Sequence, residues 1–276
     1  MNTRSSAFPP LITLQCHHHS YLCATTWRDL ATVDLTPDGH SDAIKFDPGS
    51  GRKTFFIPHE EKLTFKQLLS LLHIDKHDFK TNSSCADSKD DIPKDSGPAP
   101  GLCVPYLQHQ NTSFTEEFST LHADVEELSF ASEALGHNAS LVNFWMGDSR
   151  AVSSLHHDFF ENIYCVVAGE KLFTLVPPCD FVWLQEQKFP KGQYVRGPDS
   201  KFSIVPDREG TEIPWLTEDP DNLSSFAGPH VTVIHARVYA GEVLYLPAMY
   251  FHKVQQRGRT IAVNYWYDMH FGLSYA

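Results

Sequence analysis

The chain of 276 residues has no uninterrupted apolar run near the roughly 18 residues that a membrane-spanning helix needs, so no such helix is expected. Its six cysteines have no paired metal spacing, and we expect reduced thiols in a protein of the cytoplasm or nucleus. Positive charge is also scarce, because 22 Lys and Arg face 34 Asp and Glu, which argues against direct nucleic-acid binding. The acidity suits a substrate that presents lysine or arginine, or it simply aids solubility.

A hydrophobic content of 41% over this length is enough for one core. We expect a poorly ordered leader over residues 1–25 and one domain over 26–276, with a disordered insertion at 81–101 that is rich in Pro, Gly and Ser. Helical spacing of apolar residues predicts a helix that begins after a Thr64 cap and a second helix over Thr115–Leu128.

From Leu141 onward, short strands alternate with turns, which predicts a mainly β fold with flanking helices. The metal motif that the next paragraph describes has two parts, and these two parts lie far apart in the chain. Such long-range pairing is typical of a double-stranded β-helix of the jelly-roll or cupin kind, with its barrel core at residues 141–268. Residues 181–231 are expected to form an excursion between barrel strands that shapes the substrate entrance.

The most informative motif is Leu155-His-His-Asp158, which we place on a strand. Residues two apart on a strand point to the same face, so His156 and Asp158 can bind one metal ion, with His252 as the third ligand. Two histidines and one carboxylate with open positions are the ligand set of non-haem Fe(II) oxygenases.

Other pairs of a histidine and an acid have the same spacing, so the motif alone is weak evidence. Two of them lie in helical patterns, where residues two apart diverge, and the other two lack strand context. The helical pairs are His73/Asp75 and His122/Asp124, and the others are His40/Asp42, in a Pro-Asp-Gly turn, and His59/Glu61, in a charged stretch.

The residues after the motif suit 2-oxoglutarate, whose far carboxylate needs a cation. A strand over 162–167, a tight turn at Ala168–Glu170 and a second strand from Lys171 predict that this lysine faces the cavity, although it also reads as an ordinary solvated lysine. Tyr164 and Asn162 share one strand face, and Ser153 adds a hydroxyl. Asn264 is either an amide that lines the site or a satisfied core asparagine.

These residues resemble the JmjC-domain Fe(II)/2-oxoglutarate oxygenases, and in particular their small lysyl hydroxylase branch, from about residue 27 to 272. The resemblance implies that His156, Asp158 and His252 bind iron and that Ser153, Tyr164 and Lys171 hold 2-oxoglutarate. The matching segments are Asn143–Gly147, Ser154–Asp158, Glu161–Lys171, Gly241–Pro247 and Ala262–Met269, and Tyr106 is either a further pocket residue or a buried strand tyrosine.

The activity implied is hydroxylation of a lysine in a protein substrate, with Fe(II), 2-oxoglutarate and O2 giving succinate and CO2. Removal of an N-methyl group from lysine by the same chemistry is the alternative, and a cupin-like binding or scaffold protein without turnover is the third reading. The leader with Cys16 and His17–His19, and the end at Ala276, differ from the branch. We therefore expect the homodimer of that branch to be weakened or absent.

Overall fold

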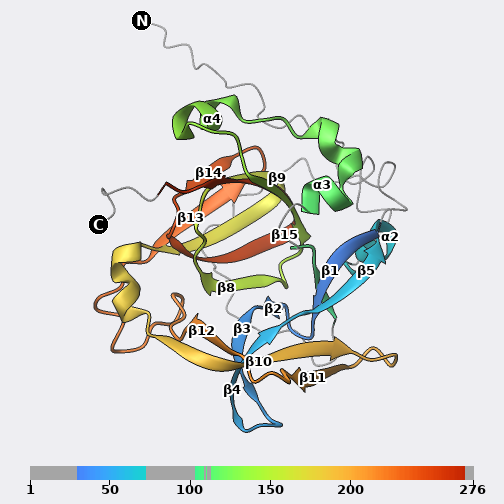
Figure 1. Cartoon of the computed structure of the whole chain (residues 1–276), viewed down its shortest axis with the longest axis vertical. Coiled ribbons are helices and arrows are strands. Elements are labelled where there is room, and N and C mark those ends of the chain that lie inside the picture. Colours follow the sequence, from blue (N-terminus) through green and yellow to red (C-terminus); the bar gives the residue numbers. More distant parts are fainter. Residues whose placement is uncertain (1–29, 73–102, 109, 111–112, 271–276) are drawn as a thin grey trace, which may run out of the picture.

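The computed structural model describes residues 30–72, 103–108, 110 and 113–270. The leader, the insertion at 81–101, the His73/Asp75 pair and the chain end lie outside these residues. The described chain forms three sheets and several short helices (Figure 1).

The largest sheet has seven strands in the order β13-β9-β15-β8-β2, with β14 pairing to β9 and β7 to β15. Figure 1 shows that it curls around an interior, which confirms the jelly-roll or cupin-like barrel. Its strands are β2 (His40–Ser41), β7 (Leu141–Gly147), β8 (Val152–His156), β9 (Phe160–Val176), β13 (Ile234–Tyr239), β14 (Val243–Leu246) and β15 (Phe251–Asp268).

The predicted hairpin at Ala168–Glu170 is wrong, because strand β9 passes through these residues. The chain does not reverse there, because β9 runs on for 17 residues and pairs with β15 on both sides of Gly169. Gly169 has φ +76°, and a Cβ there would lie 2.2 Å from the Arg259 carbonyl oxygen. Glycine therefore bends the strand at a close backbone contact instead of closing a turn.

The predicted excursion at 181–231 lies between the barrel strands β9 and β13 and contains three strands. It begins within the 3-10 helix η3 (Pro178–Trp183), and its strand β10 runs parallel to β4 from the N-terminal part of the chain. The five-stranded sheet contains β3 (Ala43–Asp47), β4 (Arg52–Ile57), β10 (Glu186–Arg196), β11 (Phe202–Pro206) and β12 (Glu212–Leu216). The third sheet contains β1 (Leu30–Thr36), β5 (His59–Thr64) and β6 (Val104–Tyr106).

The first predicted helix is confirmed as α2 (Phe65–Leu71), and Thr64 forms a capping box with Gln67. The second is wrong in extent, because the chain forms α3 (Ser113–Glu117), the 3-10 helix η2 (Ser119–Asp124) and α4 (Ser129–Leu135). At Phe118 the backbone leaves the helical region, with φ −121° and ψ 34°. Phe118 and Leu121 are both buried, so packing overrides the helical periodicity.

Two apolar clusters cover opposite faces of the barrel sheet. One lies between the sheet and the helices and includes Phe118, Phe144 and Cys165. The other fills the barrel interior and includes Tyr164 and Trp145, so Tyr164 and Cys165 point to opposite faces. The interior cluster forms the floor of the site described below.

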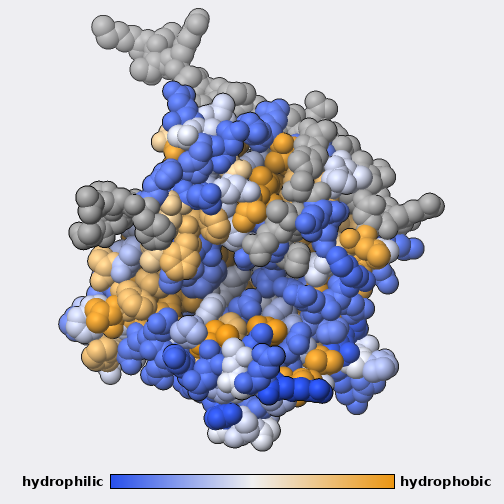
Figure 2. Space-filling view, viewed as in Figure 1, coloured by the Kyte–Doolittle hydropathy of each residue, from blue (hydrophilic) through white to orange (hydrophobic). Residues whose placement is uncertain are grey.

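Most of the visible surface is hydrophilic, but apolar side chains gather at the left of Figure 2, where Figure 1 places η3 and β13. Exposed apolar side chains in these two elements include Phe181, Val182 and Ile234. None of the helices in the described part of the chain is long and apolar enough to cross a membrane.

Candidate active site

The predicted triad comes together at one end of the barrel. His156 ends β8 and His252 lies near the start of β15, and these two residues are paired across the strands. One ligand atom from each of His156, Asp158 and His252 lies within 4.8 Å of the others. Among the described residues this is the only group of three or more such side chains close enough to hold a metal ion.

Asp158 is not on the strand where the sequence placed it. Strand β8 ends at His156, and Asp158 lies in the connection to β9, where its backbone carbonyl accepts a hydrogen bond of 2.9 Å from the Met249 amide. Its Oδ2 atom is 3.6 Å from Nε2 of His252. A contact with the loop before β15 therefore fixes this carboxylate beside the histidines.

Both histidines are held in the form that a metal requires. Nδ1 of His156 is 2.7 Å from the Ser154 carbonyl oxygen, and Nδ1 of His252 is 3.0 Å from the Tyr250 carbonyl oxygen. A proton on each Nδ1 leaves Nε2 as the donor to a metal. Burial, followed by the nearby His156, lowers the pKa of His252 to about 4, so its neutral form prevails at neutral pH. Two imidazoles that present Nε2 and one carboxylate fit Fe(II).

The prediction for two of the other pairs of a histidine and an acid requires a correction. His40/Asp42 and His59/Glu61 were expected to lack strand context, but His40 begins β2 and His59 begins β5. The sequence missed β2 because it has only two residues and pairs with the distant β8. Neither pair belongs to a potential metal-binding group among the residues described.

A cavity of about 300 Å³ lies beside the triad. The side chains predicted to surround a co-substrate line it: Ser153, Tyr164, Asn162, Tyr106 and Asn264. A second cavity of about 400 Å³ adjoins the first and shares Ser154 and Trp215 with it. Trp215 lies on β12, and its ring is nearly parallel to that of His156 at a centroid distance of 6.5 Å.

Lys171 is fully buried, so the solvated-lysine reading is wrong. Its Nζ donates hydrogen bonds to Tyr106 Oη at 3.0 Å and to Gln256 Oε1 at 2.5 Å. Within the described parts of the chain no carboxylate pairs with it, and burial lowers its pKa to about 7. The lysine stands behind Tyr106, which itself lines the cavity. A buried cation without an anion fits a ligand carboxylate.

Asn264 combines the two roles that the sequence left open. It lines the cavity and also has two internal partners, because its Oδ1 accepts from Trp145 Nε1 at 2.7 Å and its Nδ2 donates to Asn162 Oδ1 at 3.0 Å. This chain of amides and indole fixes the floor of the cavity.

Sequence reasoning missed several side chains of the cavity wall, among them Asp42, Gln108 and Trp215. Asp42 was set aside with its turn-like segment, and Trp215 lies in the excursion, which has no motif. Only the three-dimensional pairing of β2 with β8 and of β12 with β10 places Asp42 and Trp215.

A curled β-barrel with an inward-facing triad of two histidines and one aspartate defines the class of cupin-like metal oxygenases. The family model of the Cupin-like domain matches residues 8–273. The chain belongs to the JmjC-domain family of these proteins. Fe(II) and 2-oxoglutarate are the cofactor and co-substrate of this oxygenase family, and the donor set described above fits them.

Three relatives illustrate the match. JmjC domain-containing protein E of Dictyostelium discoideum is 38% identical over 88% of this chain and 71% of its own length. Lysine-specific demethylase JMJ32 of Arabidopsis thaliana is 36% identical over 93% of the chain and 72% of its length. The human bifunctional peptidase and (3S)-lysyl hydroxylase JMJD7 is 34% identical over 93% of the chain and 73% of its length.

Proposed function

We propose that this protein is an Fe(II)- and 2-oxoglutarate-dependent hydroxylase of a lysine side chain in a protein substrate. The observation that carries the proposal is the triad beside a cavity that has a buried, unpaired lysine behind its wall. The name of the human relative, a (3S)-lysyl hydroxylase, supports the choice of lysine.

In this proposal His156, Asp158 and His252 hold the iron. When bound, Fe(II) with 2-oxoglutarate and O2 supplies the oxidation of a substrate C–H bond, with succinate and CO2 as the other products. Lys171 neutralises the far carboxylate of 2-oxoglutarate, with the hydroxyl of Tyr106 beside it. Tyr164 and Ser153 are the further polar groups that hold the co-substrate, while Asn162 and Asn264 keep the cavity floor in place.

Demethylation of N-methyl-lysine is the second candidate, and the name of the Arabidopsis relative favours it. Both reactions use the same iron site and differ in the carbon that is attacked. A scaffold without turnover has less support, because such a protein has no need of a buried, uncompensated Lys171.

Mass spectrometry distinguishes the three functions. The protein is incubated with Fe(II), 2-oxoglutarate, ascorbate and a library of peptides that carry lysine or methylated lysine. A gain of one oxygen atom on lysine supports hydroxylation, loss of a methyl group supports demethylation, and no modified peptide and no succinate favours the scaffold. The His252→Ala variant is the control that separates enzymatic from adventitious oxidation.

A further inference from the structure

Asp42 lies on the wall of the iron cavity. It stands between β2 and β3 in the left-handed backbone region, with φ 51°. The Ser154 hydroxyl donates a hydrogen bond to its backbone carbonyl, which ties this residue to β8 two positions before His156. The carboxylate lines the same cavity as His156 and Trp215. Its place near the metal ligands is therefore fixed by the backbone.

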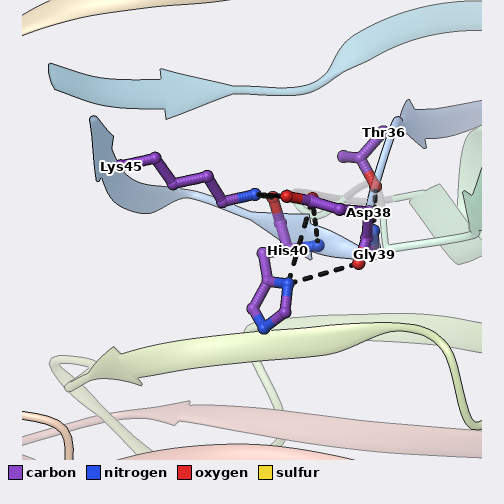
Figure 3. Close-up of polar contacts among 5 residues, drawn as sticks. All are labelled: Thr36, Asp38, Gly39, His40 and Lys45. Carbon is purple, nitrogen blue, oxygen red and sulfur yellow. Dashed lines mark hydrogen bonds and ion pairs between the residues drawn. The ribbon is translucent and has the colours of Figure 1, made fainter. Parts of the chain in front are cut away.

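The neighbouring Asp38 shows how this part of the fold neutralises an acid. Lys45 Nζ lies 2.5 Å from both carboxylate oxygens of Asp38, and Nδ1 of the His40 ring, below Asp38 in Figure 3, lies 3.9 Å from Asp38 Oδ1. Asp42 has no ion pair or hydrogen bond to its carboxylate among the residues that the structure describes. The described wall of the cavity also contains no lysine or arginine.

This arrangement leaves a carboxylate that no lysine or arginine of the described cavity wall pairs with. Burial is the main cause that raises the pKa of Asp42, nearby His156 lowers this pKa, and Glu60 raises it. The charged carboxylate is thus costly in this buried cavity, and a cation brought by a ligand offsets this cost.

Two further groups of the wall suit a cation that carries N–H donors. Gln108 donates from its Nε2 to Asp34 Oδ2 at 2.7 Å, which commits the donor end of this amide and leaves its carbonyl oxygen as an acceptor. Trp215 adds an aromatic face at the junction of the two cavities. An ammonium group, with its positive charge and its N–H donors, matches this set of a carboxylate, an amide acceptor and an aromatic face.

We propose that Asp42 is the specificity residue that binds the side-chain ammonium of the substrate lysine. The inference rests on the proposed function and deepens it, because it assigns the substrate's charged end to one residue of this chain. A side chain that lacks the amino group is bound less well because the carboxylate is left without a partner.

The test measures binding, so it does not depend on turnover. The full-length protein is loaded with Zn(II), which has no redox chemistry, and with 2-oxoglutarate. Nα-acetyl-lysine methylamide and Nα-acetyl-norleucine methylamide are then titrated by NMR, because the second probe lacks only the amino group. Asp42→Asn is the main variant, since asparagine tolerates the left-handed backbone and keeps the carbonyl that Ser154 binds. Asp38→Asn is the matched control.

We expect the wild type to bind the lysine amide about tenfold or more tightly than the norleucine amide, as for a charge-assisted hydrogen bond. Asp42→Asn should lose most of this preference while binding norleucine amide unchanged, and Asp38→Asn should keep it. The proposal is overturned if the wild type shows no preference, if Asp42→Asn keeps it, or if that variant loses affinity for both probes equally.

The two proposals fail separately. If mass spectrometry finds hydroxylated lysine but Asp42→Asn does not change binding, the role of Asp42 is refuted and the hydroxylase proposal stands. A preference for the lysine amide that depends on Asp42, without any oxidised peptide, keeps the ammonium site and removes the hydroxylase.

Discussion

Replacement of Lys171 by methionine tests how the co-substrate is held. Methionine has a similar length and no charge, and it leaves the rest of β9 in place. Lys171 is fully buried and bonded to Tyr106 and Gln256, so a carboxylate that pairs with it is shielded from water. Removing one partner of such a pair costs about 2–5 kcal/mol, or roughly 30-fold to several-thousand-fold in the affinity for 2-oxoglutarate.

The pKa of Lys171 adds a pH dependence with a definite sign. Burial lowers this pKa to about 7, so in the ligand-free protein the amine is charged below that pH and neutral above it. A bound dianion favours the charged form. Affinity for 2-oxoglutarate is therefore highest below pH 7, and at pH 8, where about one lysine in ten is protonated, it falls on the order of tenfold.

Isothermal titration with 2-oxoglutarate at saturating Zn(II), between pH 6 and 8.5, measures both effects. The wild type should lose affinity above pH 7, whereas Lys171→Met should bind weakly with a flat profile. His252 keeps its neutral form over this range because its pKa is about 4, and it does not produce the same slope. Equal affinities of the two proteins, or an equal pH slope in both, would refute the pairing of Lys171 with the co-substrate.

Three further outcomes are expected. His252→Ala should abolish turnover and weaken Mn(II) binding by more than the 10–100-fold that is typical of residues behind the metal ligands, whereas His59→Ala should keep turnover and Mn(II) binding. Turnover assays and metal titration measure the two effects, and an equal loss in both variants would contradict the site. Burial raises the pKa of Asp34 to about 7, so ionisation of Asp34 destabilises the fold as the pH rises from about 4 to 7. In urea unfolding, Asp34→Asn should therefore raise the free energy of unfolding by a few kcal/mol at pH 8 and by less at pH 5. Thr64→Ala should lower the free energy of unfolding by about 1 kcal/mol in the same assay, because the α2 cap is lost, and an unchanged value would argue against the capping box.

The candidate metal site was predictable because the chemistry of its residues is local and specific. The two-residue spacing of His156 and Asp158 indicates that both can bind one metal ion, and His252 lies in a recognisable strand pattern. The strand argument for Asp158 was nevertheless wrong in detail, since a loop contact with Met249 holds it. The residues of a candidate site can thus be grouped from the sequence even where the local backbone is misjudged.

Other features depend on partners that local patterns do not reveal. Gly169 reads as a turn residue, and only the pairing of β9 with β15 shows that the strand continues through it. The two-residue strand β2 exists only because β8 lies beside it. Asp42 and Trp215 enter the cavity through such tertiary pairings, so no periodicity or spacing identified them.

The pairing of His156 with His252 across β8 and β15 also has a consequence for how the protein is made. Contacts between residues so distant in sequence form late, since the entropy of closing the intervening chain must first be overcome. During synthesis, no metal-binding triad exists until β15 has left the ribosome and paired with β8. Capture of iron therefore reports that the barrel has closed, and a nascent or misfolded chain is spared oxidative damage by a redox metal at this site.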